Sequence, residues 1–346
     1  MKLFEIAIKP ETMFGSLLKG DTIFGHFCWQ VKHDPSLVNR GIEHWISRYE
    51  NAPFAVFSSA CPKFSADKPV YALKKPDIPL EYSLGRQNGK DRKVRYDSFK
   101  EEKRKKWVLV GEDLKLDMKF AEFATDKDLA MLARRELTHK TGARLQATAL
   151  QEFVSSFDQP HNTINRLTGT TGEGMFAPFS EAAYCFYPET ELAIFVGIEE
   201  EATDMDRVCK GLQRIGKYGY GKNASIGLGR FSISSCEEIR ISPSNVSPNA
   251  CYALSPVVPE RGGYSELYFS PFIRFGKHGD ALARSANPFK NPIIMADEGA
   301  ILFPKDTKVF NRQYLGRAVL NTSITLPASV AQGYSLFLPL SLEIAK

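Results

Sequence analysis

The chain has 346 residues, enough for two domains of ordinary size, and 43% of them are hydrophobic. This composition excludes a disordered chain and allows substantial cores. The formal net charge of +5, with a pI of about 8.7, is compatible with an anionic partner but does not establish one. No apolar run approaches the length of a membrane span, and the N-terminal residues lack a signal-peptide pattern, so we expect a cytoplasmic protein without membrane contact.

The cysteine pattern argues against a metal centre. The six cysteines include no C-x-x-C pair and no spacing typical of zinc ligands. In a chain of this size we expect reduced, mostly buried thiols. The carboxylates in the informative stretches are isolated rather than clustered, so neither a metal nor another cofactor is expected.

Strands and helices are mixed in the first 241 residues. Alternating apolar residues predict strands, and apolar spacings of three and four predict helices. The expected strands are Leu3–Lys9, Pro53–Pro62, Val70–Lys74, Glu191–Glu199 and Arg230–Ile241, and the expected helices are Thr22–His33, Ala124–Glu136 and one after Asp204 that contains Val208, Leu212 and Ile215. Asp21, Thr125 and Asp204 are the predicted N-caps of these three helices.

The remainder of the chain is predicted to be β-rich. Ser242–Asn249 is rich in Ser, Pro and Asn and is the best candidate for a linker. We therefore predict a first domain over 1–241, a linker over 242–250 and a second domain over 251–346. The strands expected in the second domain are Cys251–Val258, Glu266–Phe275, Pro292–Met295, Ala300–Phe303, Arg317–Leu320 and Tyr334–Ile344, with a short helix at Asp280–Ala286.

Positive charge is concentrated in one segment. Gly85–Lys106 holds ten Lys and Arg residues against four Asp and Glu, a net charge of +6, so the rest of the chain is close to neutral. One interpretation is a solvated insertion, and the other is an arm that lies along a polyanion. The sequence leaves both open.

A glycine-rich basic loop follows the helix capped by Asp204. Gly216–Phe231 has five glycines among sixteen residues, with Lys217, Lys222 and Arg230 spread between them. Glycine allows close approach of a ligand to the backbone, and bare amides beside cations suit phosphate oxygens. A flexible connection is the alternative. The preceding residues imitate a nucleotide phosphate loop, but Tyr218 stands where Ser or Thr should hold magnesium, so this is not a nucleotide-triphosphate site.

A second polar stretch covers His161–Gly174. It is dense in amide and hydroxyl side chains that suit contact with phosphates, 2′-hydroxyls or base edges beside Arg166. The alternative is a polar turn that satisfies its own backbone. Thr168–Gly172 also suits the tip of a hairpin.

These motifs together resemble a known family. Leu18–Trp29, His161–Arg166, Gly219–Phe231 and Gly279–Phe303 occur in the order found in the RAMP proteins of CRISPR systems. The sequence is most similar to the fourth Csm subunits of type III-A effector complexes, over nearly the whole chain. Each motif alone is weak, and the four in order are specific.

The resemblance implies an α+β fold of two ferredoxin-like (RRM-like) domains with antiparallel sheets, the first with insertions that include a thumb-like hairpin. It implies a non-catalytic subunit that holds the 5′ repeat-derived handle of the guide RNA. The implied protein partners are the large polymerase-like subunit and the first backbone RAMP subunit. A thumb of this family also reaches the guide–target duplex. Gly85–Lys106 and Arg134–Gln146 both carry suitable charge for the thumb.

The resemblance also assigns candidate RNA-binding residues by position. They are Lys19, Gly20, Asp21, His161, Asn162, Asn165, Arg166, Gly219, Gly221, Lys222, Asn223, Ser225, Gly227, Gly229 and Arg230. Amides and cations would grip phosphates, and Tyr218 and Tyr220 would stack on bases.

Two other functions stay open. A metal-independent RAMP endoribonuclease that processes repeat RNA needs a general acid and base, and His26 and His161 are the histidines within the motifs. A purely structural subunit would touch only protein. No catalytic residue is assigned.

Overall fold

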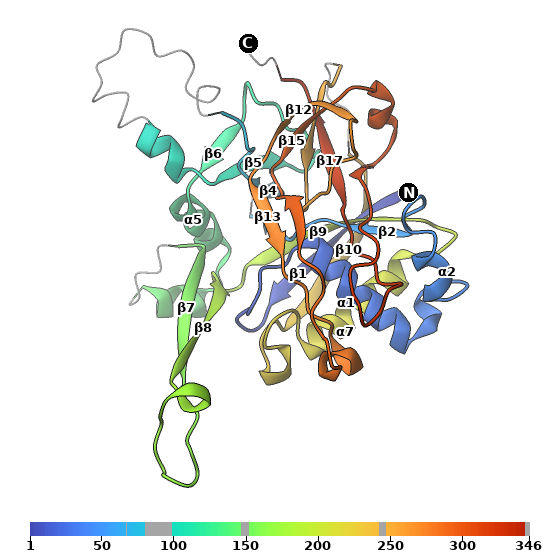
Figure 1. Cartoon of the computed structure of the whole chain (residues 1–346). Helices are drawn as coiled ribbons and strands as arrows, with labels where there is room; N and C mark the ends of the chain where they lie inside the picture. Colours follow the sequence, from blue (N-terminus) through green and yellow to red (C-terminus); the bar gives the residue numbers. More distant parts are fainter. Residues whose placement is uncertain (67, 80–98, 147–151, 242–246, 343–346) are drawn as a thin grey trace.

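The computed structural model describes residues 1–66, 68–79, 99–146, 152–241 and 247–342, and Figure 1 traces them from the N-terminus in blue to the C-terminus in red. The fold is α+β, and every strand pairing between named strands is antiparallel. Residues 85–98 of the basic segment and 242–246 of the predicted linker lie outside the described residues. The two functions considered for the basic segment therefore stay predictions.

The larger sheet is built from residues before position 240. Its eight strands are β1 (Lys2–Pro10), β2 (Ala55–Phe57), β3 (Cys61–Phe64), β4 (Val70–Lys74), β5 (Trp107–Gly111), β6 (Glu122–Ala124), β9 (Glu191–Ile198) and β10 (Phe231–Ile239). They lie in the order β10-β1-β9-β3-β4-β5-β6, with β2 also paired to β9. Strands β1 and β9 are central and almost wholly buried: β9 is apolar from Leu192 to Ile198, and the buried charge of β1, Glu5, is paired with Lys63.

Two helices cover one face of this sheet beside β1 and β10 (Figure 1). Helix α1 spans Gly20–His33 and α7 spans Met205–Tyr218. Gly211 of α7 lies so close to the Phe27 ring of α1 that a Cβ atom would be 2.6 Å from it, so the small residue lets the helices approach. Asp204 caps α7 by accepting a hydrogen bond from the Arg207 amide, as predicted.

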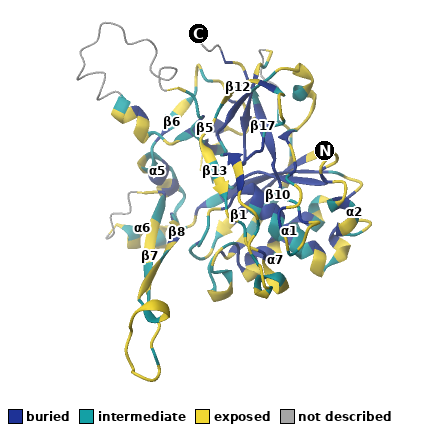
Figure 2. Ribbon diagram, in the orientation of Figure 1, coloured by how far each residue is buried: buried dark blue, intermediate teal, exposed yellow. Residues whose placement is uncertain are grey.

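The C-terminal part forms a second sheet whose buried face continues the same core. Its strand order is β12-β15-β11-β17-β16, from Tyr264–Tyr268, Ile301–Pro304, Ala250–Ala253, Tyr334–Leu340 and Tyr314–Gly316. Tyr252, Leu336 and Leu338 of this sheet belong to one cluster of buried residues with the central strands of the larger sheet (Figure 2). A two-stranded sheet, β13 (Pro271–Arg274) with β14 (Ile293–Ala296), lies beside it.

A long hairpin projects from the body of the molecule (Figure 1). Strands β7 (Val154–His161) and β8 (Phe179–Phe186) pair in unbroken register, and the residues between them form its exposed end (Figure 2). Asn165 and Thr170 form an isolated bridge at this end, so the predicted tip around Thr168–Gly172 is confirmed. Neither sequence candidate for the thumb is this hairpin: Arg134–Gln146 covers the end of helix α5 (Asp126–Glu136) and helix α6 (His139–Leu145).

Three further predictions need correction. Asp21 is not the N-cap of α1: the cap is Lys19, and the Asp21 carboxylate binds Arg274 instead. Arg317–Leu320 forms one isolated bridge rather than a strand. The thiols are not all reduced, because Cys209 of α7 and Cys236 of β10 form a disulfide.

Candidate nucleic-acid interface

The glycine-rich loop leaves the end of α7 in a conformation that requires its glycines. Gly219, Gly221, Gly227 and Gly229 all have φ between 73° and 106°, where residues with a side chain are strained. At Gly229 a Cβ atom would also lie 2.2 Å from the carbonyl oxygen of Tyr220. The conformation of the loop therefore requires glycine at these positions.

The segment that follows β1 accepts hydrogen bonds from the backbone of the loop. The amides of Lys222, Gly229 and Arg230 donate to Ser16 Oγ, the Met13 carbonyl and Thr12 Oγ1, at 3.1, 2.7 and 2.9 Å. Several of the amides expected to contact phosphates are thus used within the protein. Among the described residues, the amides at the tip of the loop, those of Asn223, Ala224 and Ser225, donate to no acceptor.

The outer side of the loop presents cations and a hydroxyl to solvent. Lys217, Lys222, Ser225 and Arg230 are exposed, and they surround the tip amides in sequence. This combination of unsatisfied amides and exposed cations is suited to an anion. The donors that remain available for the predicted phosphate contact are the tip amides and the basic side chains of the loop.

The tip of the loop contacts the projecting hairpin. Glu181 of β8 lies 3.3 Å from Lys222 Nζ through Oε1, and its Oε2 accepts a hydrogen bond from Asn223 Nδ2. The hydrogen bond from Asn223, together with Lys222, lowers the pKa of the Glu181 carboxyl. Two of the predicted RNA-binding residues are therefore joined to strand β8 of the hairpin.

Of the two tyrosines expected to stack on bases, only one is accessible. Tyr218 is 68% exposed, whereas Tyr220 is completely buried. The Tyr220 hydroxyl donates to the Leu17 carbonyl at 3.0 Å and accepts from the Lys19 amide at 3.1 Å, so it fastens the loop to the start of α1. Tyr220 has a structural role, and the prediction that it stacks on a base is wrong.

His26 supports the loop from α1 as a neutral imidazole. Its Nε2 accepts a hydrogen bond from the Gly221 amide at 3.1 Å, and its ring packs against Tyr220. Burial lowers the pKa of His26 to about 4. A ring that accepts this bond at neutral pH has no proton on that nitrogen to give to a leaving group.

This pKa predicts a dependence of stability on pH. The unfolded chain takes up a proton near pH 6.5, whereas folded His26 stays neutral down to about pH 4. Stability contributed by the neutral ring is therefore present above pH 6.5 and falls as the pH drops toward 4. The free energy of unfolding should fall between pH 7 and pH 4.5, and His26→Gln should make this fall about 2 kcal/mol smaller in urea unfolding. The control His139→Gln, at an exposed site, should leave the fall unchanged. Identical pH profiles for all three proteins would contradict this assignment.

Lys19, Gly20 and Asp21 lie where the two parts of the molecule meet. Lys19 Nζ contacts Asp297 Oδ1 at 2.7 Å and Glu298 Oε1 at 2.5 Å. The Asp21 carboxylate accepts hydrogen bonds from Nε and Nη2 of Arg274 at 2.6 and 2.8 Å. A Cβ atom at Gly20 would lie 2.2 Å from the Phe57 carbonyl oxygen. Their side chains are thus engaged within the protein, and an RNA contact from them stays a prediction.

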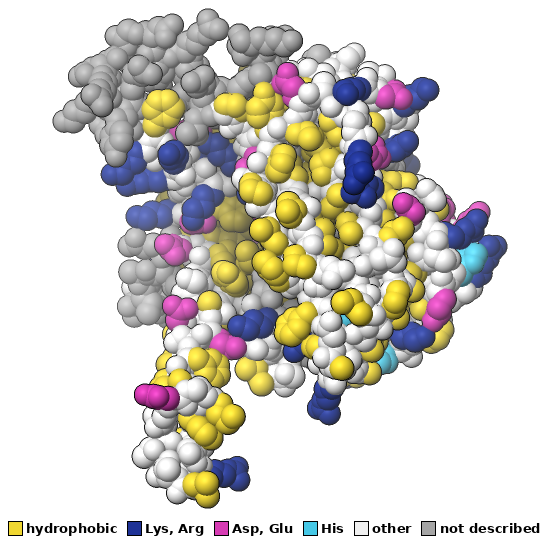
Figure 3. All heavy atoms as spheres, in the orientation of Figure 1, with side chains coloured by type: hydrophobic (Ala, Val, Ile, Leu, Met, Phe, Trp, Pro, Cys, Tyr) yellow, Lys and Arg dark blue, Asp and Glu magenta, His cyan; other side chains and the backbone are white. Residues whose placement is uncertain are grey.

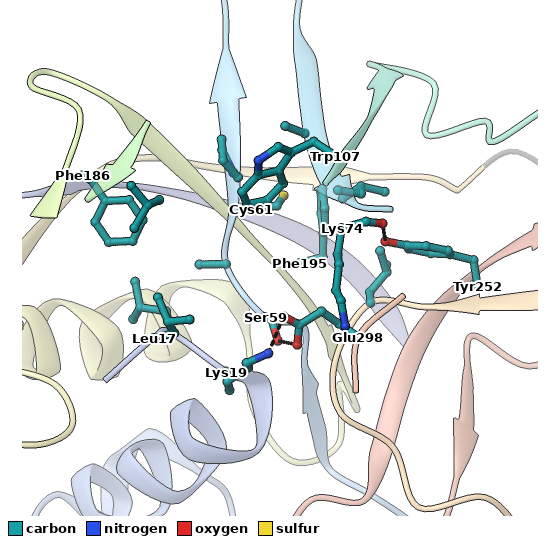
Figure 4. A pocket seen from close by; sticks show the side chains of 17 residues that line it. Leu17, Lys19, Ser59, Cys61, Lys74, Trp107, Phe186, Phe195, Tyr252 and Glu298 are labelled. Carbon is teal, nitrogen blue, oxygen red and sulfur yellow. Dashed lines mark hydrogen bonds and ion pairs between the residues drawn. The ribbon is translucent and has the colours of Figure 1, made fainter. Parts of the chain in front are cut away.

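A cavity of about 100 Å³ opens beside these ion pairs. Figure 4 shows Lys19, Ser59 and Glu298 at one side of it, with Trp107 and Cys61 at another. Ser59 Oγ donates to Glu298 Oε2 at 3.1 Å, and burial raises the pKa of the Glu298 carboxyl. Most of the lining is apolar and comes from both parts of the chain.

The predicted residues of the hairpin are distributed along it rather than gathered. The His161 ring stacks on Phe179 across the two strands, with ring centres 5.2 Å apart. Asn162 and Arg166 are exposed, and the Asn165 side chain accepts from the Leu167 amide at 2.9 Å. The structure therefore brings the glycine-rich loop to strand β8 of the hairpin, and Asn165 and Arg166 lie beyond it at the far end.

Sequence reasoning missed the residues that position the loop. Thr12 and Ser16 follow β1 without any motif, and Glu181 occupies an ordinary alternating strand position. Their importance comes from contacts with residues at least 42 positions away in the chain. No local pattern marks them.

Comparisons with known proteins identify the fold. No protein-family model and no curated protein matches the sequence. A chain from the crystal structure of a Csm1–Csm4 cassette in complex with cA4 superposes with a TM-score of 0.57 at 15% identity. A chain from the same kind of cassette in complex with pppApA superposes with a TM-score of 0.54 at 16% identity. Both superpositions cover 100% of this chain and 100% of the other chain. A chain from the Csm3–Csm4 subcomplex of the type III-A CRISPR-Cas interference complex superposes with a TM-score of 0.54 at 12% identity, over 98% of this chain and 99% of that chain.

Csm4 is the subunit that these complexes have in common. The chain has a Csm4-like fold. The resemblance noticed in the four motifs is confirmed at this level. Separately, no helix within the described ranges is both long and apolar enough to cross a membrane.

Proposed function

We propose that this chain is a non-catalytic subunit of a type III-A CRISPR effector complex that binds the 5′ handle of the guide RNA through its glycine-rich loop. The observation that carries the proposal is the tip of that loop, where amides without acceptors among the described residues lie between exposed Lys222 and Arg230 on a Csm4-like fold. Single-stranded RNA offers phosphates and 2′-hydroxyls to such donors. Exposed Tyr218 beside the loop adds a surface for base stacking.

The order of elements supports a ferredoxin-like first domain. A ferredoxin-like unit runs β-α-β-β-α-β, and here β1, α1, β2, β9, α7 and β10 follow that order. In the sheet they lie as β10-β1-β9 with β2 beside β9, so the first strand is central. The family resemblance extends the same proposal to the β-rich residues 251–346, and the boundaries 1–241, 242–250 and 251–346 remain predictions.

The β7–β8 hairpin is proposed as the thumb. Its outer end exposes Ile164, Leu167 and Met175, with Leu167 97% exposed. Apolar side chains on a projecting ribbon suit insertion beside stacked bases. The hairpin would thus reach the guide–target duplex with its outer end while its strand β8 stays in contact with the handle-binding loop.

The endoribonuclease alternative has less support. His26 is held neutral by burial and accepts a hydrogen bond from the loop, which suits a structural role. Incubation of the purified chain with labelled repeat RNA tests this point. Metal-independent scission that is lost in His26→Ala or His161→Ala would replace the proposed function by the enzymatic one.

An apolar face on β13 and β14 is proposed to contact a partner subunit. Ile273 and Ile294 are cross-strand neighbours and are 49% and 70% exposed, and Phe275 after β13 is 74% exposed. Figure 3 shows hydrophobic side chains gathered over the middle of the molecule, where Figure 1 places β13. A contiguous exposed apolar patch of this kind is typical of a protein interface.

We expect the double variant Ile294→Asp/Phe275→Asp to reduce co-purification of one partner by about tenfold or more, because the introduced charges would be buried on assembly. That partner is the large polymerase-like subunit or the first backbone subunit. Phe120→Asp is the control. Phe120 is 85% exposed, and it lies between β5 and β6 rather than on β13 or β14. The measurement is a pull-down with tagged partners followed by quantitative staining. Unchanged recovery of both partners would remove this face from the assembly.

The function itself is tested by co-expression with repeat RNA and the two partner subunits. The proposal predicts that RNA with the 5′ handle is recovered with this chain, and that the purified chain retains the isolated handle in a filter-binding assay. Recovery of both partners without any RNA contact would favour the purely structural alternative.

A further inference from the structure

Glu181 occupies the donors that a phosphate would need. It lies on β8, opposite Gln159 in the hairpin register, and its two carboxylate oxygens contact Lys222 Nζ and Asn223 Nδ2. Lys222 and Asn223 both belong to the predicted RNA-binding set. No other part of the loop makes an ion pair with the hairpin among the described residues.

A carboxylate and a phosphodiester are interchangeable for such donors, because both are anionic oxygen acceptors. They compete for these donors, because two anions held close together beside the same ammonium group repel each other. A phosphate that takes both of these donors therefore displaces Glu181 from them.

We propose that Glu181 is an internal competitor for the RNA backbone, which holds Lys222 and Asn223 in the free protein and is displaced when the handle binds. This inference rests on the proposed function and adds a regulatory contact to it. The contact also links RNA binding to the hairpin, because Glu181 is part of β8 and the adjacent Tyr184 is bonded to Phe14 in both backbone directions, at 2.9 and 2.8 Å. Displacement frees the side-chain contact and leaves the backbone attachment of the hairpin in place.

Breaking the Glu181–Lys222 ion pair costs little free energy. The Lys222 side chain is 52% exposed and the Glu181 side chain 23% exposed, so solvent screens their attraction. A polyanion that engages Lys222, Arg230 and the tip amides together replaces one partly screened contact by several. A single small anion replaces only one, so the competition favours a nucleic acid strand over an isolated phosphate.

Glu181→Gln tests the competition, because glutamine keeps the shape and removes the charge. Handle RNA binding should tighten about three- to tenfold, as expected for removal of a competing surface charge. The control Glu173→Gln makes the same charge change on the exposed end of the same hairpin and should change affinity less than twofold. In the Lys222→Ala background the gain from Glu181→Gln should shrink to less than half, because the main cation for which Glu181 and the phosphate compete is then absent.

The outcomes separate the inference from the function on which it rests. If the wild type binds RNA and Lys222→Ala weakens binding, but Glu181→Gln matches Glu173→Gln or binds more weakly, the competition is refuted and the proposed function stands. If the wild type binds no handle RNA and Glu181→Gln binds none either, the proposed function and the competition are both refuted. Thermal unfolding of each variant confirms that the folded proteins are compared.

Discussion

Replacing Lys222 and Arg230 together by alanine is expected to weaken binding of the single-stranded handle about 10- to 100-fold at moderate salt, because each side chain supplies a charge-assisted contact to a phosphate. Both residues are exposed at the edges of the glycine-rich loop, and their backbone bonds to Ser16 and Thr12 do not depend on the side chains. The loop should therefore keep its conformation in the double variant. Fluorescence anisotropy with labelled handle RNA measures the effect.

The salt dependence gives a second readout of the same variant. Loss of two phosphate contacts should make the slope of log affinity against log salt shallower by about one to two units. Lys305→Ala with Lys308→Ala is the control, because both residues are exposed cations of the C-terminal part. Equal affinity and equal slope for the wild type and the loop variant would remove the loop from the RNA site.

The second large effect concerns stability. Arg274→Met is expected to lower the free energy of unfolding by about 3 kcal/mol, because it leaves the Asp21 carboxylate buried without its partner. The Asp21 side chain is only 5% exposed, and Arg274 binds both of its oxygens. Urea unfolding followed by circular dichroism provides the measurement.

The matched control for this variant is Arg312→Met. Arg312 also pairs with a carboxylate, that of Glu260 at 3.5 Å, but both side chains are more than a third exposed. Its loss should cost less than about 1 kcal/mol. A cost for Arg274→Met no greater than that for Arg312→Met would show that the ion pair to α1 does not hold the C-terminal part in place.

Local signals predicted the elements whose stability is local. The spacing of Val208, Leu212 and Ile215 and the cap at Asp204 place α7 correctly, because these residues act within one helix. The Thr125 cap of α5 is confirmed for the same reason, as part of a capping box with Asp128. The apolar residues of β1, β4 and β9 were also sufficient to locate these strands, although buried Glu5 interrupts the apolar run of β1.

Features set by distant contacts could not be predicted. Asp21 has the residue type of an N-cap, but it lies within the first turn of α1, and Arg274, 253 residues further along the chain, takes its carboxylate. Tyr218 and Tyr220 are two residues apart in one loop, and only the fold decides that one is exposed and the other buried. Charge pointed to other segments as the thumb, whereas the projecting hairpin that we propose as the thumb carries exposed apolar residues at its end.

The candidate site was predicted in part. The sequence located the glycine-rich loop and its cations, and the positive φ angles explain why glycine is needed there. It overestimated the number of available amides, because Ser16, Thr12 and Met13 accept several of them. Glu181 was absent from the prediction, and it is the residue that joins the loop to the hairpin.

Photo-crosslinking of the assembled complex tests the central claim most directly. The complex would be reconstituted with guide RNA that carries 4-thiouridine within the 5′ handle, irradiated and digested, and the crosslinked peptides of this chain identified by mass spectrometry. We predict crosslinks within residues 217–230, reduced in the Lys222→Ala/Arg230→Ala variant. Efficient crosslinks of the handle to another surface of this chain, or to its partners alone, would contradict the account.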